Sequence, residues 1–359
     1  MRVFTVIGNR PQFVKAAAVS FRLREVADEV LVHTGQHYDD DLSAVFFDEL
    51  ELPRPEHRLE LGGGTNTEQT GRMLEALGPL IAEEAPDVVL VYGDTNSTLA
   101  GAVAGAQAHV PVAHVEAGMR SFDRAMPEEL NRVLADHAAD LLLCSAEAPA
   151  AHLRREGVQG EIVVVGDVMV DVAHFVAPRA RERTAVLDAC GVRSGEYLVA
   201  TAHRAGNVDD LGRLERLVGL LTSLGEPVVL PLHPRTRARL EAAGLLGDLE
   251  AAVRVVPPLG YLDFTALLVH ARAVLTDSGG VQKEAYLAGV PCLTLRDRTE
   301  WTETVEAGWN AVVDLDPAAA QAALGRRPPD ARPPLYGDGR AGERVVQALL
   351  ALREREVVA

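Results

Sequence analysis

Three carboxylates stand at positions where a parallel sheet would bring them together. Asp94 follows an apolar run at 87–92, and Glu116 follows another at 111–115. Such runs favour buried parallel strands, whose carboxyl ends share one edge of a sheet. Glu128 lies in the first turn of a predicted helix near the same edge. Crowded carboxylates repel one another, which tends to leave a protonated acid beside an ionised base. The pattern indicates acid/base chemistry, although capping would explain Glu128 and a turn would explain Asp94.

A second stretch with chemical potential is Thr-Asp-Ser-Gly-Gly-Val-Gln-Lys-Glu at 276–284. It follows a short apolar run and opens a helical pattern, so it predicts a strand, a small-residue turn and a helix start. Ser278, Gly279 and Gly280 leave backbone N–H groups uncovered at the positive end of that helix, where a phosphate can be held. Glu284 lies about one turn into the helix and can accept hydrogen bonds from a ribose. The alternative is an ordinary Ser-capped helix.

Two cations follow the first predicted strand, at 3–7. Arg10 and Lys15 then lie at or just beyond its carboxyl end, where open α/β sheets bind ligands. The alternative is that both are solvated surface side chains. The turn at 8–10 has a single glycine and lacks Gly-x-Gly-x-x-Gly, so no nicotinamide or flavin dinucleotide is indicated. We expect no cofactor and no metal.

Composition excludes several classes of function. The 359 residues carry a formal charge of -17 without a long basic run, which argues against nucleic acid and anionic membranes as partners. Cys144, Cys190 and Cys292 are far apart and lack metal-ligand spacing, so we expect core thiols in a reducing compartment. The start of the sequence is too short an apolar run for a signal peptide, and no segment approaches the roughly 20 apolar residues of a membrane span. We expect a cytoplasmic protein.

Strands and helices alternate along both halves of the chain. In each half the predicted strands deliver polar or cationic residues to one edge, which predicts an α/β fold of two Rossmann-like, doubly wound domains facing a cleft. The expected domains are 1–172, with the catalytic acids, and 173–340, with the nucleotide site. A C-terminal helix at 341–359 is expected near their junction. The polar passage at 178–184 is the candidate inter-domain region, and 326–339 is predicted to be a loop.

Six motifs occur along the chain in a recognisable order. They are Gly-Asn-Arg-Pro-Gln-Phe-Val-Lys at 8–15, His-Thr-Gly-Gln-His at 33–37, Gly-Asp-Thr-Asn-Ser-Thr at 93–98, His-Val-Glu-Ala-Gly-Met-Arg at 114–120, Pro-Glu-Glu-Leu-Asn-Arg at 127–132 and the stretch at 276–284. Together they resemble the non-hydrolysing UDP-N-acetylglucosamine 2-epimerases nearly from end to end. The resemblance implies the two-domain GT-B architecture, a UDP-sugar substrate and a homodimer. Phe13, Met126, 281–283 and 298–301 are more similar to a branch that includes UDP-2,3-diacetamido-2,3-dideoxyglucuronate 2-epimerases.

The resemblance also implies a mechanism and a set of roles. The C2 proton of the sugar is removed while UDP leaves C1, which gives a 2-acetamidoglucal, and UDP then re-adds with a proton delivered to the opposite face. The implied catalytic residues are Asp94, Glu116, Glu128 and His203. The residues implied to bind the pyrophosphate are Arg10, Lys15, Arg132 and also His203. Those implied to bind the other parts of the nucleotide are Ser278, Gly279 and Gly280 at phosphate, Glu284 at the ribose and Phe264 at uracil. A second UDP-GlcNAc site that activates some bacterial members matches Gln36, His37, Arg204 and His233.

Three departures from the family pattern bear on substrate choice and activation. Gly206 stands where the family commonly has a glutamate, Lys283 replaces a frequent glutamate, and Asn9 replaces a threonine or alanine. The first hypothesis is interconversion of UDP-GlcNAc and UDP-ManNAc, and the alternative is 2-epimerisation of the diacetamidoglucuronate nucleotide. A hydrolysing epimerase, a GT-B glycosyltransferase and a non-enzymatic UDP-sugar sensor are further alternatives. The last two would not need all three acids.

Overall fold

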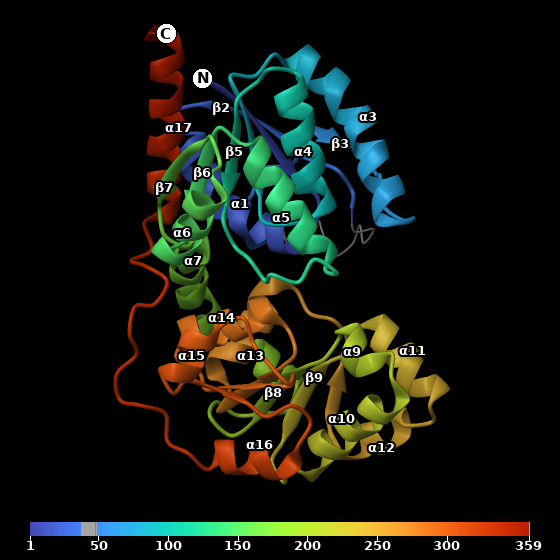
Figure 1. Ribbon diagram of the computed structural model, residues 1–359. Coiled ribbons are helices and arrows are strands. Elements are labelled where there is room, and N and C mark those ends of the chain that lie inside the picture. Colours follow the sequence, from blue (N-terminus) through green and yellow to red (C-terminus); the bar gives the residue numbers. More distant parts are fainter. Residues whose placement is uncertain (37–46, 48, 359) are drawn as a thin grey trace. The chain divides into compact units, whose positions relative to one another are not determined.

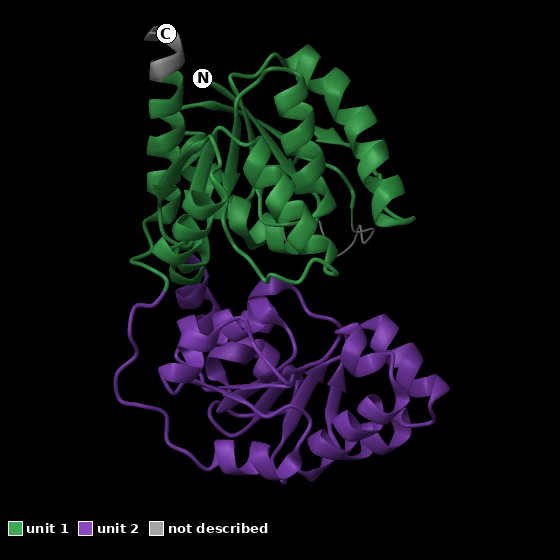
Figure 2. Cartoon of the chain, in the orientation of Figure 1, with its two compact units in different colours: residues 1–174, 336–359 green, residues 175–335 purple. Residues whose placement is uncertain are grey.

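The computed structural model describes residues 1–36, 47 and 49–358. The chain forms two compact units (Figure 2). Unit 1 consists of Met1–His174 together with Tyr336–Ala359, and unit 2 is Phe175–Leu335. The chain therefore leaves unit 1 once and returns to it once.

Within the described residues, unit 1 is built on a seven-stranded parallel sheet of order β3-β2-β1-β4-β5-β6-β7 (Figure 1). Its strands are β1 (Arg2–Ile7), β2 (Asp28–His33), β3 (His57–Arg58), β4 (Val88–Tyr92), β5 (Val112–Val115), β6 (Leu141–Cys144) and β7 (Glu161–Val164). Its helices are α1 (Arg10–Leu23), α3 (Asn66–Glu84), α4 (Asn96–Gln107), α5 (Pro127–Ala138), α6 (Glu147–Glu156), the first part of α7 (Val168–Glu182) and α17 (Ala341–Val358).

Unit 2 repeats this plan on a six-stranded parallel sheet of order β10-β9-β8-β11-β12-β13. Its strands are β8 (Leu198–Thr201), β9 (Val228–Pro231), β10 (Arg254–Val256), β11 (Ala273–Thr276), β12 (Cys292–Thr294) and β13 (Asn310–Val312). Its helices, besides the end of α7, are α8 (Ala185–Ala189), α9 (Ala205–Val208), α10 (Leu211–Ser223), α11 (Pro234–Ala242), α12 (Leu246–Ala252), α13 (Tyr261–His270), α14 (Gly279–Ala288), α15 (Thr302–Glu306) and α16 (Pro317–Leu324).

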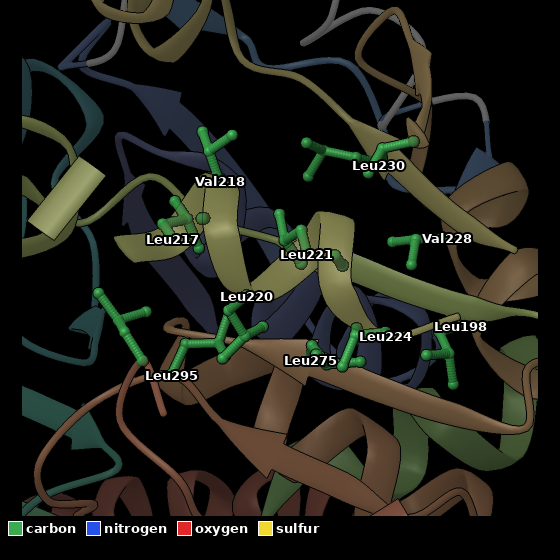
Figure 3. Packing of buried hydrophobic residues seen from close by; sticks show 14 of the residues in the cluster. Leu198, Leu217, Val218, Leu220, Leu221, Leu224, Val228, Leu230, Leu275 and Leu295 are labelled. Atoms are coloured by element: carbon green, nitrogen blue, oxygen red, sulfur yellow. The ribbon is translucent and has the colours of Figure 1, made fainter. Parts of the chain in front are cut away.

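The strands form where the sequence is apolar without interruption. All five residues of β4, Val-Val-Leu-Val-Tyr, are buried, as expected for a parallel strand covered on both faces. In unit 2 the apolar side of α10 packs on the sheet (Figure 3). The residues that Figure 3 labels there include Leu217, Leu220 and Leu221 of α10 and its C-cap residue Leu224, with Leu198, Val228 and Leu275 of the strands.

Each sheet has a point where the strand order reverses. In unit 1 this point lies between β1 and β4, and in unit 2 between β8 and β11. The loops that follow two such strands lead away in opposite directions and leave room for a ligand at their carboxyl ends. The expected Rossmann-like, doubly wound organisation of both halves is therefore confirmed.

The passage at 178–184 begins inside a helix. Pro178 lies within α7, whose residues Val172, Val176 and Ala180 are buried at a spacing of four. The predicted loop at 326–339 is confirmed, because no helix or strand falls in it. Among the helices that the structure describes, none combines the length and apolarity needed to cross a lipid bilayer.

Candidate active site

Two of the predicted acids meet two of the predicted cations in unit 1. Tyr92 of β4 and Val115 of β5 are partners in the parallel register, so Asp94 and Glu116, which follow them, leave the sheet from neighbouring strands. The Lys15 ammonium, from α1, donates to the Glu116 carboxylate. The Arg132 guanidinium, from α5, donates in the same way to Asp94. These four side chains are the acid cluster of the candidate site.

The acid cluster is only slightly open to solvent. The side chains of Lys15 and Glu116 are 15% and 16% exposed, and Arg132 and Asp94 are 18% and 30% exposed. Burial by itself lowers the pKa of Lys15, but Glu116 and Asp94 raise it above its ordinary value. The ammonium therefore stays charged and stabilises carboxylates at this edge. The expectation that the acids raise one another's pKa stays a prediction.

Glu128 lies at the exposed beginning of α5, four residues before Arg132 on the same side of the helix. Its neighbour Glu129 is buried and accepts hydrogen bonds from Ser121 N (2.7 Å), Ser121 Oγ (2.9 Å) and Phe122 N (3.0 Å). Burial would raise the pKa of Glu129, but the hydrogen bonds from Ser121 lower it below its usual range. Glu129 thus anchors the loop after Glu116, a role that the sequence did not indicate.

Gln12 links the loops at the reversal point of unit 1, and sequence reasoning assigned it no role. Its Oε1 accepts from Gly8 N (2.7 Å), and its Nε2 donates to Tyr92 O (2.8 Å) and Thr98 Oγ1 (3.0 Å). A side chain at Gly8 would collide, because an added Cβ would lie 2.0 Å from Ser97 Oγ. Glycine is therefore required at the turn that begins α1. Arg10, the first residue of α1, is partly exposed beside this turn.

A third acid, besides Glu116 and Asp94, belongs to the electrostatic surroundings of Lys15. Asp167, which follows β7 and is 4% exposed, contributes to the raised pKa of Lys15 after Glu116 and Asp94. Its Oδ1 accepts from Met169 N (2.9 Å) at the start of α7. The signal in the sequence was an acid placed after a strand, as with Asp94 and Glu116.

Of the two activator residues predicted in unit 1, the structure describes Gln36, in the loop after β2. The Gln36 Oε1 accepts from Ser97 N (3.1 Å) and Ser97 Oγ (2.6 Å), so this amide helps to fix the start of α4. His33 Nδ1 accepts from Gly35 N (2.7 Å), and burial lowers the pKa of His33 to about 4. His37 lies outside the described residues.

In unit 2 the turn between β11 and α14 has the predicted form. Ser278 occupies the N-cap position of α14, but its side chain makes no capping hydrogen bond. One detail was wrong: the Ser278 N–H is not uncovered, because it donates to Thr276 Oγ1 (3.0 Å). Trp301 Nε1 donates to Gly279 O (2.8 Å), and an added Cβ at Gly279 would lie 2.9 Å from Glu300 Oε1. The loop at 298–301 therefore closes over the beginning of α14. Gly280 lies next along the same turn.

Asp277 organises the other side of this turn. Its carboxylate is fully buried and accepts from His203 N (3.2 Å), Arg204 N (3.0 Å) and Asn207 Nδ2 (3.0 Å). This carboxylate joins the loop after β8 to the loop after β11, where the strand order of unit 2 reverses. The His203 side chain, held through its backbone, stays half exposed. The sequence motif contained Asp277, but its part in positioning His203 was missed.

Glu284 and its neighbours follow along α14. Burial raises the pKa of Glu284 to about 7, although Tyr261 and Lys283 act against this shift. Tyr261 Oη donates to Glu284 Oε1 across 3.4 Å. The Lys283 ammonium lies 4.1 Å from the centre of the Trp301 ring, a cation–π contact. Glu284 is thus poised to gain or lose a proton near neutral pH.

The remaining predicted residues of unit 2 lie on a helix, as Phe264 does, or at the N-cap of one, as Arg204 and His233 do. Phe264, on α13, packs against a small apolar cluster that includes Leu268. His233 caps α11, since its Nδ1 accepts from Arg235 N (3.2 Å). Arg204 Nη2 lies 3.9 Å from Glu300 Oε1. The roles assigned to these residues by the resemblance stay predictions.

Two parallel α/β sheets, each with ionisable side chains at its reversal point, place the chain among GT-B-like enzymes. Residues 21–350 match the family model for UDP-N-acetylglucosamine 2-epimerase. UDP-2,3-diacetamido-2,3-dideoxy-D-glucuronate 2-epimerase of Pseudomonas aeruginosa is 45% identical, over 98% of this chain and all of that relative. A UDP-N-acetylglucosamine 2-epimerase homolog of Methanococcus maripaludis is 42% identical over 97% of this chain and 99% of that protein.

Structural similarity agrees with these relationships. The crystal structure of Methanocaldococcus jannaschii UDP-GlcNAc 2-epimerase in complex with UDP-GlcNAc and UDP is 39% identical and has a TM-score of 0.88, covering 98% of this chain and all of that one. The chain belongs to the UDP-N-acetylglucosamine 2-epimerase family and is a UDP-sugar 2-epimerase. The family predicted from the sequence is confirmed.

Proposed function

We propose that the protein is a non-hydrolysing 2-epimerase of UDP-2,3-diacetamido-2,3-dideoxyglucuronate. The observation that supports this choice of sugar is the 45% identity, over 98% of this chain and all of that relative, to the Pseudomonas aeruginosa enzyme named for that substrate. The likeness at 298–301, where this chain has Arg-Thr-Glu-Trp, points to the same branch. This proposal reverses the order of the two sugars that the sequence alone favoured.

The acid cluster is proposed to carry out the proton transfers at C2. A hydrogen at C2 is weakly acidic, so its removal needs a positioned carboxylate while charge on the departing UDP is stabilised elsewhere. Asp94 and Glu116 each accept a hydrogen bond from a cation, Arg132 and Lys15 respectively, which holds both carboxylates at the same edge of the sheet. Glu128, more exposed and one turn from Arg132, is proposed as the third member of the set.

Unit 2 is proposed to bind UDP. The start of α14 offers the positive end of a helix to phosphate, with His203 held nearby by Asp277. Glu284 is proposed to accept from the ribose hydroxyls, and Phe264 to contact uracil. Arg10, Lys15, Arg132 and His203 are proposed to receive the pyrophosphate.

Interconversion of UDP-GlcNAc and UDP-ManNAc is the second candidate. It is favoured by the 42% and 39% identical relatives, which are named for UDP-N-acetylglucosamine. The two candidates share one mechanism and differ in the substituents at C3 and C5 of the sugar. We also propose two properties that the resemblance implies. Activation by a second UDP-GlcNAc molecule is tested by kinetics, and a homodimeric state is tested by light scattering.

The deciding experiment is proton NMR of the purified protein in D2O, with each UDP-sugar in a separate tube and no added cofactor. We expect faster formation of the C2 epimer, with deuterium at C2, from the diacetamidoglucuronate nucleotide. Faster turnover of UDP-GlcNAc would select the second candidate. Free sugar with UDP would indicate a hydrolase, and nucleotide binding without any exchange at C2 would indicate a sensor.

A further inference from the structure

The loops that carry Asp94 and Glu116 are joined by a buried pair of side chains, His114 and Asp136. His114 belongs to β5 and Asp136 to α5, and neither side chain is exposed. His114 Nδ1 lies 2.7 Å from Asp136 Oδ1. His114 Nε2 lies 2.7 Å from the backbone carbonyl oxygen of Gly93, the residue before Asp94. The imidazole ring thus bridges one acid-bearing loop to helix α5.

The partners of the ring determine where its hydrogens are. A carbonyl oxygen only accepts, so His114 Nε2 must donate to Gly93 O. Asp136 also accepts from Gly118 N (3.1 Å) and Arg120 Nη1 (2.7 Å), two donors that call for an ionised carboxylate. Burial raises the pKa of Asp136, but His114 and Arg120 hold it below its usual range. An ionised Asp136 only accepts, so His114 Nδ1 must donate as well.

The charges around the pair balance. Arg120 Nε and Nη2 donate to Glu156 Oε1 (2.8 Å) and Oε2 (2.6 Å), so the network contains the cations His114 and Arg120 and the anions Asp136 and Glu156. Burial raises the pKa of the neighbouring Cys144 thiol to about 12, which keeps it neutral. A buried charge is tolerated when it is paired and hydrogen-bonded in this way.

The network holds backbone on both sides of the acid cluster. Gly93 immediately precedes Asp94, and Gly118, bound by Asp136, lies two residues after Glu116. Glu116 itself has a φ of +71°, a left-handed conformation that is costly for a residue other than glycine. Such backbone persists only where its surroundings hold it in place. The network supplies this support next to the carboxylate.

We propose that His114, with a hydrogen on both ring nitrogens, and Asp136 are positioning residues that set the geometry of Asp94 and Glu116 for proton transfer at C2. The role in catalysis rests on the proposed function, whereas the assignment of a hydrogen to each ring nitrogen of His114 rests on the hydrogen-bond contacts alone. Neither residue touches the reacting atoms.

The first test observes the ring directly. In protein labelled with 15N-histidine, we expect one residue to show two ring N–H groups with the nitrogen shifts of an imidazolium, assigned by their loss in His114→Gln. In Asp136→Asn this residue should show a single ring N–H group. A wild-type spectrum in which no histidine shows two ring N–H groups would overturn the proposal, even if neither variant folds and even if the protein turned over no UDP-sugar.

The second test measures turnover. Asp136→Asn should lower kcat by about 10- to 100-fold, since a small misplacement of catalytic groups is costly, with the Kd for UDP within about 2-fold of wild type. Asp140→Asn is the matched control, because Asp140 Oδ2 accepts from Val112 N (2.9 Å) at the other end of β5. This control should keep kcat within about 2-fold. If the wild-type protein turns over its UDP-sugar and Asp136→Asn does so at the same rate, the positioning role is refuted.

Discussion

At the scale of single residues, Glu116 has the strictest requirements in the candidate site. Its carboxylate meets Lys15, and its backbone is left-handed. Glu116→Gln keeps the size of the side chain but removes its charge and its basicity. We expect turnover to fall by about 10²- to 10⁴-fold, the usual range for a general acid or base. Kinetics together with UDP titration by calorimetry test this expectation, with the Kd for UDP expected within a few-fold of wild type. Full activity in this variant would remove Glu116 from the catalytic set.

Glu284 predicts a pH dependence of nucleotide binding. Its pKa is raised to about 7, so its carboxylate forms in the folded protein only as the pH rises through about 7. A ribose needs that carboxylate as an acceptor, so the affinity for UDP-GlcNAc should rise over the same interval and level off above it. The free energy of unfolding of the free protein should change in the opposite direction and fall as the pH rises towards 7. The reason is that folded Glu284 retains a proton that the unfolded state has lost. Calorimetric titrations across this range should show the rise in wild type and a flat profile in Glu284→Gln. A flat wild-type profile would contradict the role.

The residue types of the site were predictable from the sequence, and several of their partners were not. Acids after strands and the small-residue turn at 278–280 are local patterns that a single sequence displays. Asp277, Gln12 and Glu129 act through hydrogen bonds to residues that lie far away in the sequence or around a loop. No periodicity records such contacts, so these positioning residues emerged only from the structure.

At the scale of elements, the positive end of helix α14 has a carboxylate of the protein itself beside it, that of Glu300 from the loop at 298–301. Glu300 lies against Gly279 and accepts from Arg296 Nη1 (2.8 Å). A phosphate at this helix end would be repelled by that carboxylate, so Glu300→Gln should strengthen UDP binding several-fold. Calorimetric titration is the measurement, and Glu306→Gln, an exposed change in α15, is the control. Weaker binding in Glu300→Gln would mean instead that this carboxylate contacts the nucleotide.

Helix α17 is fixed to unit 1 through a cap from a distant helix. Asp171, on α7, accepts from Ala341 N and Gly342 N, each at 3.0 Å, and so satisfies the free N–H groups at the start of α17. Asp171→Ala should lower the free energy of unfolding by about 1 kcal/mol, as losses of helix caps do. Urea denaturation followed by circular dichroism measures this change, with the exposed Glu241→Ala as a control that should leave stability unchanged. An Asp171→Ala protein as stable as wild type would show that water replaces the cap.

Most elements were predictable because their strands are short, wholly apolar runs bounded by polar loops. The apolar run at 111–115, for example, forms a strand at Val112–Val115. The beginning of α7 was harder, because Gly166 and Asp167 precede it as in a loop and Pro178 lies within it. The apolar spacing of Val172, Val176 and Ala180 carried the helical signal, and it was outweighed by Pro178 and by the arginines at 179, 181 and 183.

At the scale of the whole molecule, each unit has its own sheet and its own buried core. A fragment of residues 175–335 should therefore fold alone and bind UDP within about 10-fold of the full chain, since the proposed nucleotide residues of unit 2 are all in it. Nuclear magnetic resonance of the labelled fragment with and without UDP tests both expectations. If the fragment folds but does not bind UDP, the nucleotide must be bound mainly by residues of unit 1.

The return of the chain to unit 1 has a consequence for biosynthesis. Helix α17 packs on α1, near the other end of the sequence, and is capped by Asp171. A ribosome makes about 5 to 20 residues per second, so unit 2 can emerge and fold as a unit while the first unit still lacks its last helix. The part of the enzyme that is made first is thus the part that is finished last. During that interval α1 has an apolar side without its partner, and this is the point at which a chaperone would be most useful to the nascent chain.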